Sequence, residues 1–236
     1  MSRKTFEGFG ALANLNLSAT RRAGRYEAQA EGEKKVPPDV LRKLALTPSD
    51  TLFDVGCGPG KITRALAPKV KSIVAMDHPL TIDRLRKERL PKNISLLAGE
   101  FPDVKPARQF SKVMAYSVIH YLSSEAEVIR FIDEALSLLK PGGRMLIGDL
   151  PNIDRRERFH KSPAGRRFAV TWAALVKKGR APPQIEDPDL PVVTDAFVIR
   201  LLGHCRSKGL HAWVMPQHPE LPFGRTREDI LIERPG

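Results

Sequence analysis

The chain has 236 residues, of which 42% are hydrophobic and 28% charged, a composition typical of a compact globular domain rather than a disordered or fibrous chain. No segment approaches the roughly 20 consecutive apolar residues that cross a bilayer, and the first residues lack the apolar stretch of a signal peptide. Two cysteines, Cys57 and Cys205, are too few for a disulfide framework. We therefore expect a soluble, cytoplasmic protein without a membrane span.

The chain is strongly basic, with 39 Lys and Arg residues against 27 Asp and Glu residues and a formal net charge of +12. Such a charge favours anionic partners, namely nucleic acid, membrane headgroups or phosphorylated small molecules. A basic composition rich in Arg and Pro also arises from the base composition of a GC-rich genome. The net charge therefore limits the class of partner without naming it.

Residues 1–48 are expected to form a helical extension that caps the domain beginning at residue 49. A helix is predicted over Thr20–Glu33, and it contains a basic cluster of Arg21, Arg22 and Arg25. Two consecutive prolines follow, and Pro38 suits the first turn of a short helix that runs through Leu46.

From Thr51 onward, short apolar segments alternate with helical patterns. Strands are predicted over residues 52–55, 72–76, 94–97, 110–116 and 144–148, and helices over residues 61–66, 79–89, 125–139 and 195–208. Two further strand candidates, residues 210–215 and 229–233, flank the turn-forming segment 219–224 and suit an antiparallel return. The alternation predicts an α/β fold, in which a doubly wound, mostly parallel sheet is covered by helices on both faces.

A glycine-rich turn, Asp54-Val55-Gly56-Cys57-Gly58-Pro59-Gly60, stands where the first strand ends and a helix begins. Glycine lets the backbone turn tightly and approach a ligand, although a simple strand-to-helix turn would need the same residues. A dinucleotide fingerprint needs a small residue where Lys61 stands. A triphosphate-binding loop needs Gly and Ser or Thr in place of Val55 and Ile62. Both phosphate-binding motifs are therefore excluded.

Asp77 closes the second predicted strand, about 20 residues beyond the glycines. A carboxylate at this position can accept hydrogen bonds from both hydroxyls of a ribose. It can also cap the helix that begins with His78 and Pro79. Together with the glycine turn, Asp77 favours a ligand that contains a ribose.

These features resemble those of the class I S-adenosylmethionine-dependent methyltransferases. The glycine turn, Asp77, Gly99-Glu100 and Leu139-Lys140-Pro141-Gly142-Gly143 follow the order and spacing of that family over roughly residues 40–150. The resemblance implies a three-layer α/β/α fold with a seven-stranded mixed sheet in the order 3-2-1-4-5-7-6, its last strand antiparallel. It also implies a methyltransferase domain over residues 49–236, in which residues 151–192 form a lid-like insertion over the acceptor site.

By the same resemblance the cofactor is S-adenosyl-L-methionine and the product S-adenosyl-L-homocysteine. The glycine turn would hold the methionine end, Asp77 the ribose and Glu100 the adenine amino group, although the family more often has Asp at this last position. His78 would lie against the adenine, and Tyr116 and Ser117 would line the sulfonium pocket. The residues that the resemblance assigns to the cofactor are Asp54, Gly56, Cys57, Gly58, Gly60, Asp77, His78, Glu100, Phe101, Tyr116 and Ser117.

Two residues are candidates for a catalytic base, because a hydroxyl acceptor must lose a proton when it attacks the methyl group. His120 follows the fourth strand and titrates near neutrality, and Asp149 closes the fifth predicted strand. Each also has a structural interpretation, His120 as a packed ring at the start of a helix and Asp149 as a helix cap or loop carboxylate. No metal is expected, because the six His and two Cys lack zinc spacing and Asp149 with Asn152 are too few for a carboxylate site.

A basic segment over residues 155–180 follows, where the family often places part of a lid over the acceptor. Together with Phe159, Phe168 and Trp172 it suits an anionic acceptor. Alternatively, it is a solvated helix that turns Phe168, Trp172 and Leu175 to the core.

We expect methyl transfer to a small or carrier-linked, anionic acceptor, at oxygen rather than nitrogen. Two further interpretations stay open, namely an RNA methyltransferase and a homologue that binds the cofactor without catalysis. The segment Tyr116-Ser117-Val118-Ile119 lacks the Pro-Pro motif of base-amine methyltransferases, so nucleic acid is not the favoured acceptor.

Overall fold

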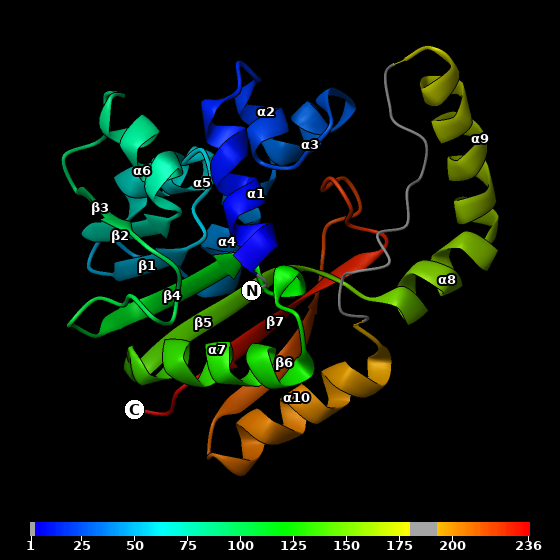
Figure 1. Ribbon diagram of the computed structural model, residues 1–236. Coiled ribbons are helices and arrows are strands. Elements are labelled where there is room, and N and C mark those ends of the chain that lie inside the picture. Colours follow the sequence, from blue (N-terminus) through cyan, green and yellow to red (C-terminus); the bar gives the residue numbers. More distant parts are fainter. Residues whose placement is uncertain (1–2, 180–192) are drawn as a thin grey trace.

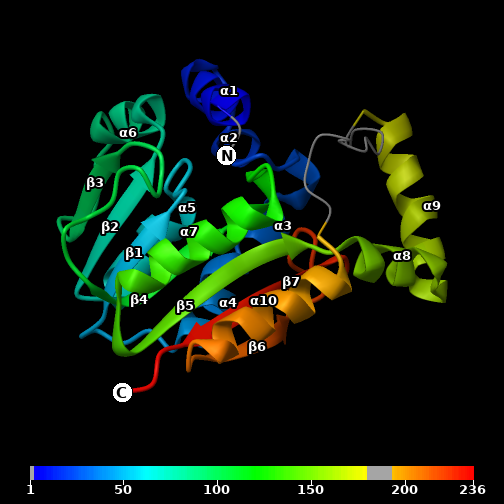
Figure 2. The same cartoon turned by 60° about the horizontal axis from the view of Figure 1, so that its bottom comes forward.

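The computed structural model describes residues 3–179 and 193–236, which form three layers around one sheet (Figures 1 and 2). In this part of the chain, seven strands run in the order β3-β2-β1-β4-β5-β7-β6. β1 to β5 pair in parallel, whereas β7 is antiparallel to both β5 and β6. The predicted order and the antiparallel last strand are confirmed. The strands are β1 (Thr51–Val55), β2 (Ser72–Asp77), β3 (Ile94–Ala98), β4 (Phe110–Tyr116), β5 (Leu139–Pro151), β6 (His211–Pro216) and β7 (Arg227–Glu233).

Helices cover both faces of the sheet, as predicted. One face carries α7 (Glu125–Ser137) and α10 (Asp195–Ser207), which lie in front in Figure 1. The other face carries α4 (Val36–Leu44), α5 (Lys61–Leu66) and α6 (Pro79–Arg86). Short 3-10 helices are η1 (Glu27–Gln29), η2 (Ala67–Lys69) and η3 (Ile119–Tyr121). No helix of the described residues is long and apolar enough to cross a membrane.

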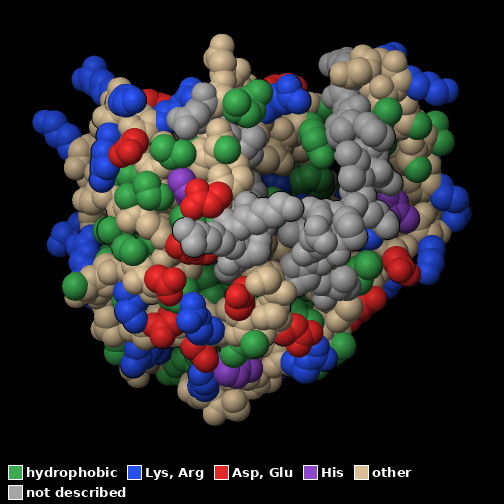
Figure 3. All heavy atoms as spheres, in the orientation of Figure 1, with side chains coloured by type: hydrophobic (Ala, Val, Ile, Leu, Met, Phe, Trp, Pro, Cys, Tyr) green, Lys and Arg blue, Asp and Glu red, His purple; other side chains and the backbone are tan. Residues whose placement is uncertain are grey.

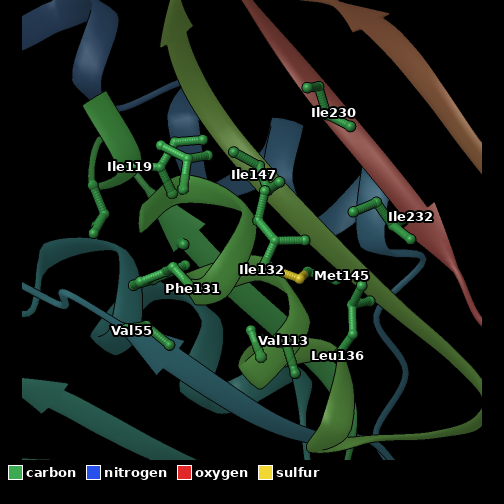
Figure 4. Packing of buried hydrophobic residues seen from close by; sticks show 14 of the residues in the cluster. Val55, Val113, Ile119, Phe131, Ile132, Leu136, Met145, Ile147, Ile230 and Ile232 are labelled. Carbon is green, nitrogen blue, oxygen red and sulfur yellow. The ribbon is translucent and has the colours of Figure 1, made fainter. Parts of the chain in front are cut away.

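Alternating side chains of the strands supply the core on each face. In β4, Val113 belongs to the cluster beneath α7, whereas Met114 belongs to the cluster beneath α4, as the two-residue period of a strand requires. Figure 4 shows Ile132 of α7 beside Val113 and Met145, all of them fully buried. Truncating such a side chain typically costs about 2–5 kcal/mol. The sheet is therefore a rigid platform for the loops that follow its strands.

The N-terminal segment differs from the single helix predicted over Thr20–Glu33. The structure breaks this range into α2 (Ala19–Arg22), η1 and α3 (Ala30–Glu33), and it adds α1 (Arg3–Asn14) before them. The predicted helix was wrong because Gly24 has a φ of 69° and Tyr26 is extended, so the chain turns out of the helix after Arg22. Together with α4, these helices form the N-terminal extension, here called the cap (residues 3–48). In Figure 1, α1, α2 and α3 lie above the sheet, whereas α4 packs on its face.

The fifth strand is longer than the predicted range 144–148. β5 runs from Leu139 to Pro151 because its start pairs with Phe110 of β4 and its end pairs with Arg227 of β7. The pairing with β7 is irregular between Ile147 and Leu150. Asp149 consequently lies within an irregular part of β5, rather than at the end of the strand as predicted.

The basic segment forms α8 (Ile153–Lys161) and α9 (Pro163–Lys177). Ser162 caps α9 by accepting a hydrogen bond from the Gly165 N–H, and a Cβ at Gly165 would lie 2.0 Å from the carbonyl of Phe159. The two helices therefore turn sharply against each other, and α9 stands away from the sheet (Figures 1 and 2). The interpretation in which α9 packs Phe168 onto the core is wrong, since Phe168 is 37% exposed. The remainder of the predicted lid, residues 180–192, lies outside the described residues.

Candidate active site

The glycine turn is fastened to the neighbouring strand by the backbone. The N–H groups of Gly56 and Cys57 both donate to the carbonyl oxygen of Met76, at 2.8 and 3.0 Å. Gly58 has a φ of 52°, and a Cβ at this residue would meet no atom within 4 Å. The turn is thus held by its hydrogen bonds to β2, and its backbone at Gly58 faces open space that a ligand can occupy.

Asp77 joins this turn through its carboxylate. The Gly58 N–H donates to Oδ2 of Asp77 at 2.8 Å, and the His78 N–H donates to Oδ1 at 2.7 Å. Burial raises the pKa of Asp77, although these two donors act in the opposite direction. The carboxylate therefore stands beside the glycine turn, as the prediction of a ribose contact requires.

A cavity opens above the turn, between the sheet and the cap, and contains most of the residues assigned to the cofactor. Those that line it are Gly56, Cys57, Gly58, Asp77, His78, Glu100, Phe101, Tyr116 and Ser117. The cap contributes Phe6, Ala13, Arg22, Ala23, Arg25, Glu33, Val36 and Pro37 to the opposite wall. The three-dimensional structure thus brings together segments that are up to about 110 residues apart.

Asp54 and Gly60 are the two assigned residues that do not line the cavity. Asp54 is buried, and its Oδ2 accepts a hydrogen bond from the Thr63 hydroxyl at 2.6 Å. Burial raises the pKa of Asp54 to about 7, and the nearby charge of Asp77 acts in the same direction. Asp54 therefore ties β1 to the start of α5 beneath the turn, and its contact with a methionine end stays a prediction.

Aromatic and histidine side chains line the side of the cavity where the sequence predicts an adenine. His78 lies between the cap and α6: its ring is 4.6 Å from the ring of Phe6, and its Nδ1 accepts the Leu80 N–H at 3.1 Å. Phe101 is buried, with its ring centroid 4.9 Å from that of Phe131. Burial raises the pKa of Glu100. These positions suit a planar base, and the individual contacts stay predictions.

Two strained residues lie directly after β4 and within the irregular part of β5. Ser117 and Asp149 have φ values of 60° and 62°, in the left-handed region that side chains other than glycine rarely adopt. Each such residue typically costs about 1–3 kcal/mol and persists only where its surroundings fix it. Here the Asp149 N–H donates to Oδ1 of Asp229 at 2.8 Å, and the Ser117 N–H donates to the carbonyl of Gly148 at 2.9 Å. Backbone strain of this kind is typical of functional sites.

Asp149 is the centre of a buried ionic cluster. Its carboxylate contacts the guanidinium of Arg25 from the cap and the hydroxyl of Ser117, and Arg227 Nη1 donates to its Oδ2 at 2.6 Å. Although burial acts in the opposite direction, Arg227 and Arg25 hold the pKa of Asp149 well below its usual range. Phe223 lies beneath both guanidinium groups, 4.9 Å from Arg25 and 4.1 Å from Arg227.

The Asp149 cluster carries excess positive charge, because two guanidinium groups surround one carboxylate. Burial and the charge of Arg25 lower the pKa of Arg227, whereas Asp149 acts in the opposite direction on both guanidinium groups. Sequence reasoning noted Arg25 within a basic cluster but missed Arg227. No local pattern marks Arg227, which reaches Asp149 only through the pairing of β7 with β5.

His120 occupies η3, just beyond β4. Its side chain is buried, its ring centroid is 4.1 Å from that of Tyr121, and its Nδ1 has no hydrogen-bond partner among the described residues. Burial and the charge of Arg227 lower the pKa of His120 to about 3. The imidazole is therefore neutral at physiological pH and binds a proton weakly.

Metal ligands do not gather at this site. Within residues 3–179 and 193–236, no group of three or more His, Cys, Asp or Glu side chains could hold a metal ion.

Comparison with known proteins agrees with this geometry. The sequence profile of the family described as a methyltransferase domain matches residues 52–143. The chain is 31% identical over 159 residues to chondramide synthase from Chondromyces crocatus, a match that covers 63% of the chain and 4% of that synthase. It is 27% identical over 179 residues to nodulation protein S from Rhizobium tropici, covering 75% of the chain and 74% of the relative.

Solved structures extend the likeness to the whole fold. The N-methyltransferase NodS from Bradyrhizobium japonicum, in complex with S-adenosyl-L-homocysteine, superposes with a TM-score of 0.61 at 18% identity, covering 98% of this chain and 99% of that one. Residues 52–143 therefore form a methyltransferase domain, and the solved structure shares the fold of the whole described chain. The S-adenosyl-L-homocysteine bound in the NodS structure is the product form of the cofactor that the sequence predicts for this chain.

Proposed function

We propose that the protein transfers the methyl group of S-adenosyl-L-methionine to a carboxylate oxygen of a small anionic molecule. One observation carries this choice of acceptor: the excess positive charge of Arg25 and Arg227 around Asp149, at the ends of β4 and β5. Arg25 also lines the cavity that contains the residues assigned to the cofactor. An anionic group drawn to Arg25 would therefore arrive beside the cofactor.

A carboxylate acceptor also suits the groups available for catalysis. When bound, the cofactor supplies an electrophilic methyl group on a positively charged sulfur. Asp149 is ionised, but Arg25, Arg227 and Ser117 all contact its Oδ2 and lower its pKa, so it binds a proton weakly. His120 holds a proton weakly. A carboxylate needs neither residue as a base, because it is deprotonated before it attacks, so alignment by Arg25 is the main requirement.

In this proposal Asp149 and His120 have supporting roles. Asp149 holds the two guanidinium groups in place, and His120 offers a neutral imidazole beside Tyr121. Either residue would become a base only for a hydroxyl acceptor, the role that the sequence predicts for them.

The proposal also includes the organisation of the chain: a cap over residues 1–48, a methyltransferase domain over residues 49–236 and, within it, a lid over residues 151–192. It includes a cytoplasmic location as well, which the buried free thiols of Cys57 and Cys205 support.

Nitrogen is the second candidate acceptor atom. The likeness to nodulation protein S and to an N-methyltransferase structure favours it, and a neutral amine also attacks without a strong base. The charge of Arg25 and Arg227 disfavours it, because an amine acceptor is cationic before it loses its proton. The basic surface is also compatible with an acid linked to a carrier protein and with an RNA acceptor.

The test is to incubate the protein with methyl-labelled cofactor and a fractionated cell extract. We expect label in small molecules that bind an anion-exchange resin, and we expect Arg25→Met to lower that labelling by roughly 10–100-fold. Arg21→Met is the matched control, because Arg21 is exposed in the same basic cluster. Label in RNA, in protein or in small cations would contradict the proposed acceptor. Absence of transfer, with the cofactor still bound, would identify a homologue without catalysis.

A further inference from the structure

Aromatic side chains of the cap and of α9 meet beside the Asp149 cluster. We propose that they bind an aromatic ring of the acceptor, so that the substrate class is an aromatic acid; this inference rests on the proposed function. The rings are Tyr26, Phe168 and Trp172, here called the ring strip. The Trp172 ring centroid is 6.2 Å from that of Tyr26 in an edge arrangement and 5.7 Å from that of Phe168 in a stacked one.

The ring strip is open to solvent for much of its area. Tyr26 and Phe168 are each 37% exposed, and α9 buries only Gly165 of its described residues. Large exposed aromatic side chains that lie together are typical of a binding surface rather than of a core. Figure 3 shows that this face of the molecule is hollowed beside the cap, with hydrophobic and basic side chains at the bottom of the hollow. A flat ligand would cover apolar surface that the protein leaves exposed.

A polar atom within the ring strip also lacks a partner. Trp172 Nε1 is shielded from solvent, yet it has no hydrogen-bond partner among the described residues. An unsatisfied buried donor typically costs about 1–3 kcal/mol. A substituent of a bound ring, such as a hydroxyl, carbonyl or nitro oxygen, could accept this N–H. The donor adds a directional contact to an otherwise apolar surface.

The ring strip is continuous with the cationic cluster. Tyr26 follows Arg25 directly in the chain, and Tyr121, which lines the cavity, lies near enough to both Arg25 and Tyr26 for each to act on its pKa. One molecule could therefore place its ring against Tyr26 and Trp172 and its carboxylate beside Arg25. Charge complementarity selects the anion, and the ring strip selects an aromatic body over an aliphatic one.

Fluorescence tests this inference without relying on turnover. The chain has two tryptophans, so Trp213→Phe leaves Trp172 as the only indole. We would titrate this variant, saturated with S-adenosyl-L-homocysteine, with benzoate and with cyclohexanecarboxylate, which carry the same charge. We expect a saturable change in Trp172 emission and roughly 3–10-fold tighter binding of benzoate. Equal affinities, or no change in emission while benzoate binds by calorimetry, would overturn the inference.

Two variants separate the ring from its N–H group. With a labelled aromatic acid as acceptor, Trp172→Ala is expected to raise KM by about tenfold and Trp172→Phe by roughly threefold, with kcat little changed. Val170→Ala is the control, because Val170 is 73% exposed on the same helix. A KM unchanged in Trp172→Ala overturns the inference, even where small anions are still methylated. Failure of the proposed function is a different result, namely no label in any small anion with the unaltered chain.

Discussion

The two halves of the site meet at one cavity, which Arg25 and Ser117 of the Asp149 cluster line, but they are held together by different interactions. At the ends of β1 and β2, backbone N–H groups of the glycine turn donate to Met76 and to Asp77, which lie about 20 residues away. At the ends of β4 and β5, Arg25 of the cap and Arg227 of β7 converge on Asp149 from 124 and 78 residues away. The half predicted to bind the cofactor (the cofactor half) is fixed mainly by contacts between residues about 20 apart, although the cap lines the opposite wall of its cavity. The half proposed to bind the acceptor (the acceptor half) forms only when the cap and β7 are in place. Stability and acceptor specificity should depend on the second half, and cofactor affinity on the first.

Removing the carboxylate of Asp149 should have the largest effect. Asp149→Ala leaves Arg25 and Arg227 buried without a counter-charge, and breaking a buried ion pair in this way typically costs about 3–5 kcal/mol. Urea denaturation measures the free energy of unfolding. Asp103→Ala is the control, because its pair with Arg130 is exposed and should contribute less than about 1 kcal/mol. Similar losses in the two variants would show that the ionic cluster does not hold the acceptor half together.

In the cofactor half, Asp77→Ala should weaken binding of S-adenosyl-L-homocysteine more than Glu100→Ala does. The Asp77→Ala variant would lose two charge-assisted hydrogen bonds to the ribose, which corresponds to an affinity lower by roughly 100-fold or more. The Glu100→Ala variant would lose one hydrogen bond to the adenine. Isothermal titration calorimetry gives both affinities. Equal losses, or none, would count against the ribose contact assigned to Asp77.

The pH dependence of stability should report the burial of Asp54. Its pKa in the folded chain is raised to about 7, whereas an unfolded Asp titrates near 3.9, so the folded state keeps a proton that the unfolded chain releases. This contribution to stability is complete below about pH 4 and is lost as the pH rises to about 7. Asp54→Asn should therefore gain stability relative to the unaltered chain between pH 5 and pH 8, by roughly 1–3 kcal/mol. Parallel stability curves for the two proteins would mean that Asp54 is charged in the folded state.

His120 should give the smallest effect. Because its pKa is lowered to about 3 and a carboxylate acceptor needs no base, kcat/KM should show no inflection near pH 6.5. His120→Gln should change kcat less than about tenfold. An inflection near pH 6.5 that disappears in His120→Gln would instead identify His120 as a base and the acceptor as a hydroxyl.

The same contrast explains what the sequence predicts. The glycine turn and Asp77 follow from local patterns whose geometry is set within about 20 residues, and their arrangement could be predicted. The strand order is implied by the resemblance to a known family, not by these local patterns, and the structure confirms it. The break of the cap helix at Gly24 could have been suspected, since glycine favours a left-handed turn. The partners of Asp149 could not be predicted from the sequence, because strand pairing positions Arg227 and the docking of the cap positions Arg25. The exposed position of α9 also depends on tertiary packing rather than on its amphipathic pattern.

The chemical stability of the methylated product tests the central claim most directly. A methyl ester releases its methyl group as volatile methanol in mild alkali, whereas N-methyl and ether products do not. With methyl-labelled S-adenosylmethionine and an extract of small acids, we predict that most of the transferred label becomes volatile after alkaline treatment, and that Arg25→Met lowers this fraction by roughly 10–100-fold. Transferred label that withstands alkali would contradict the account, because it would place the methyl group on nitrogen or on a hydroxyl oxygen.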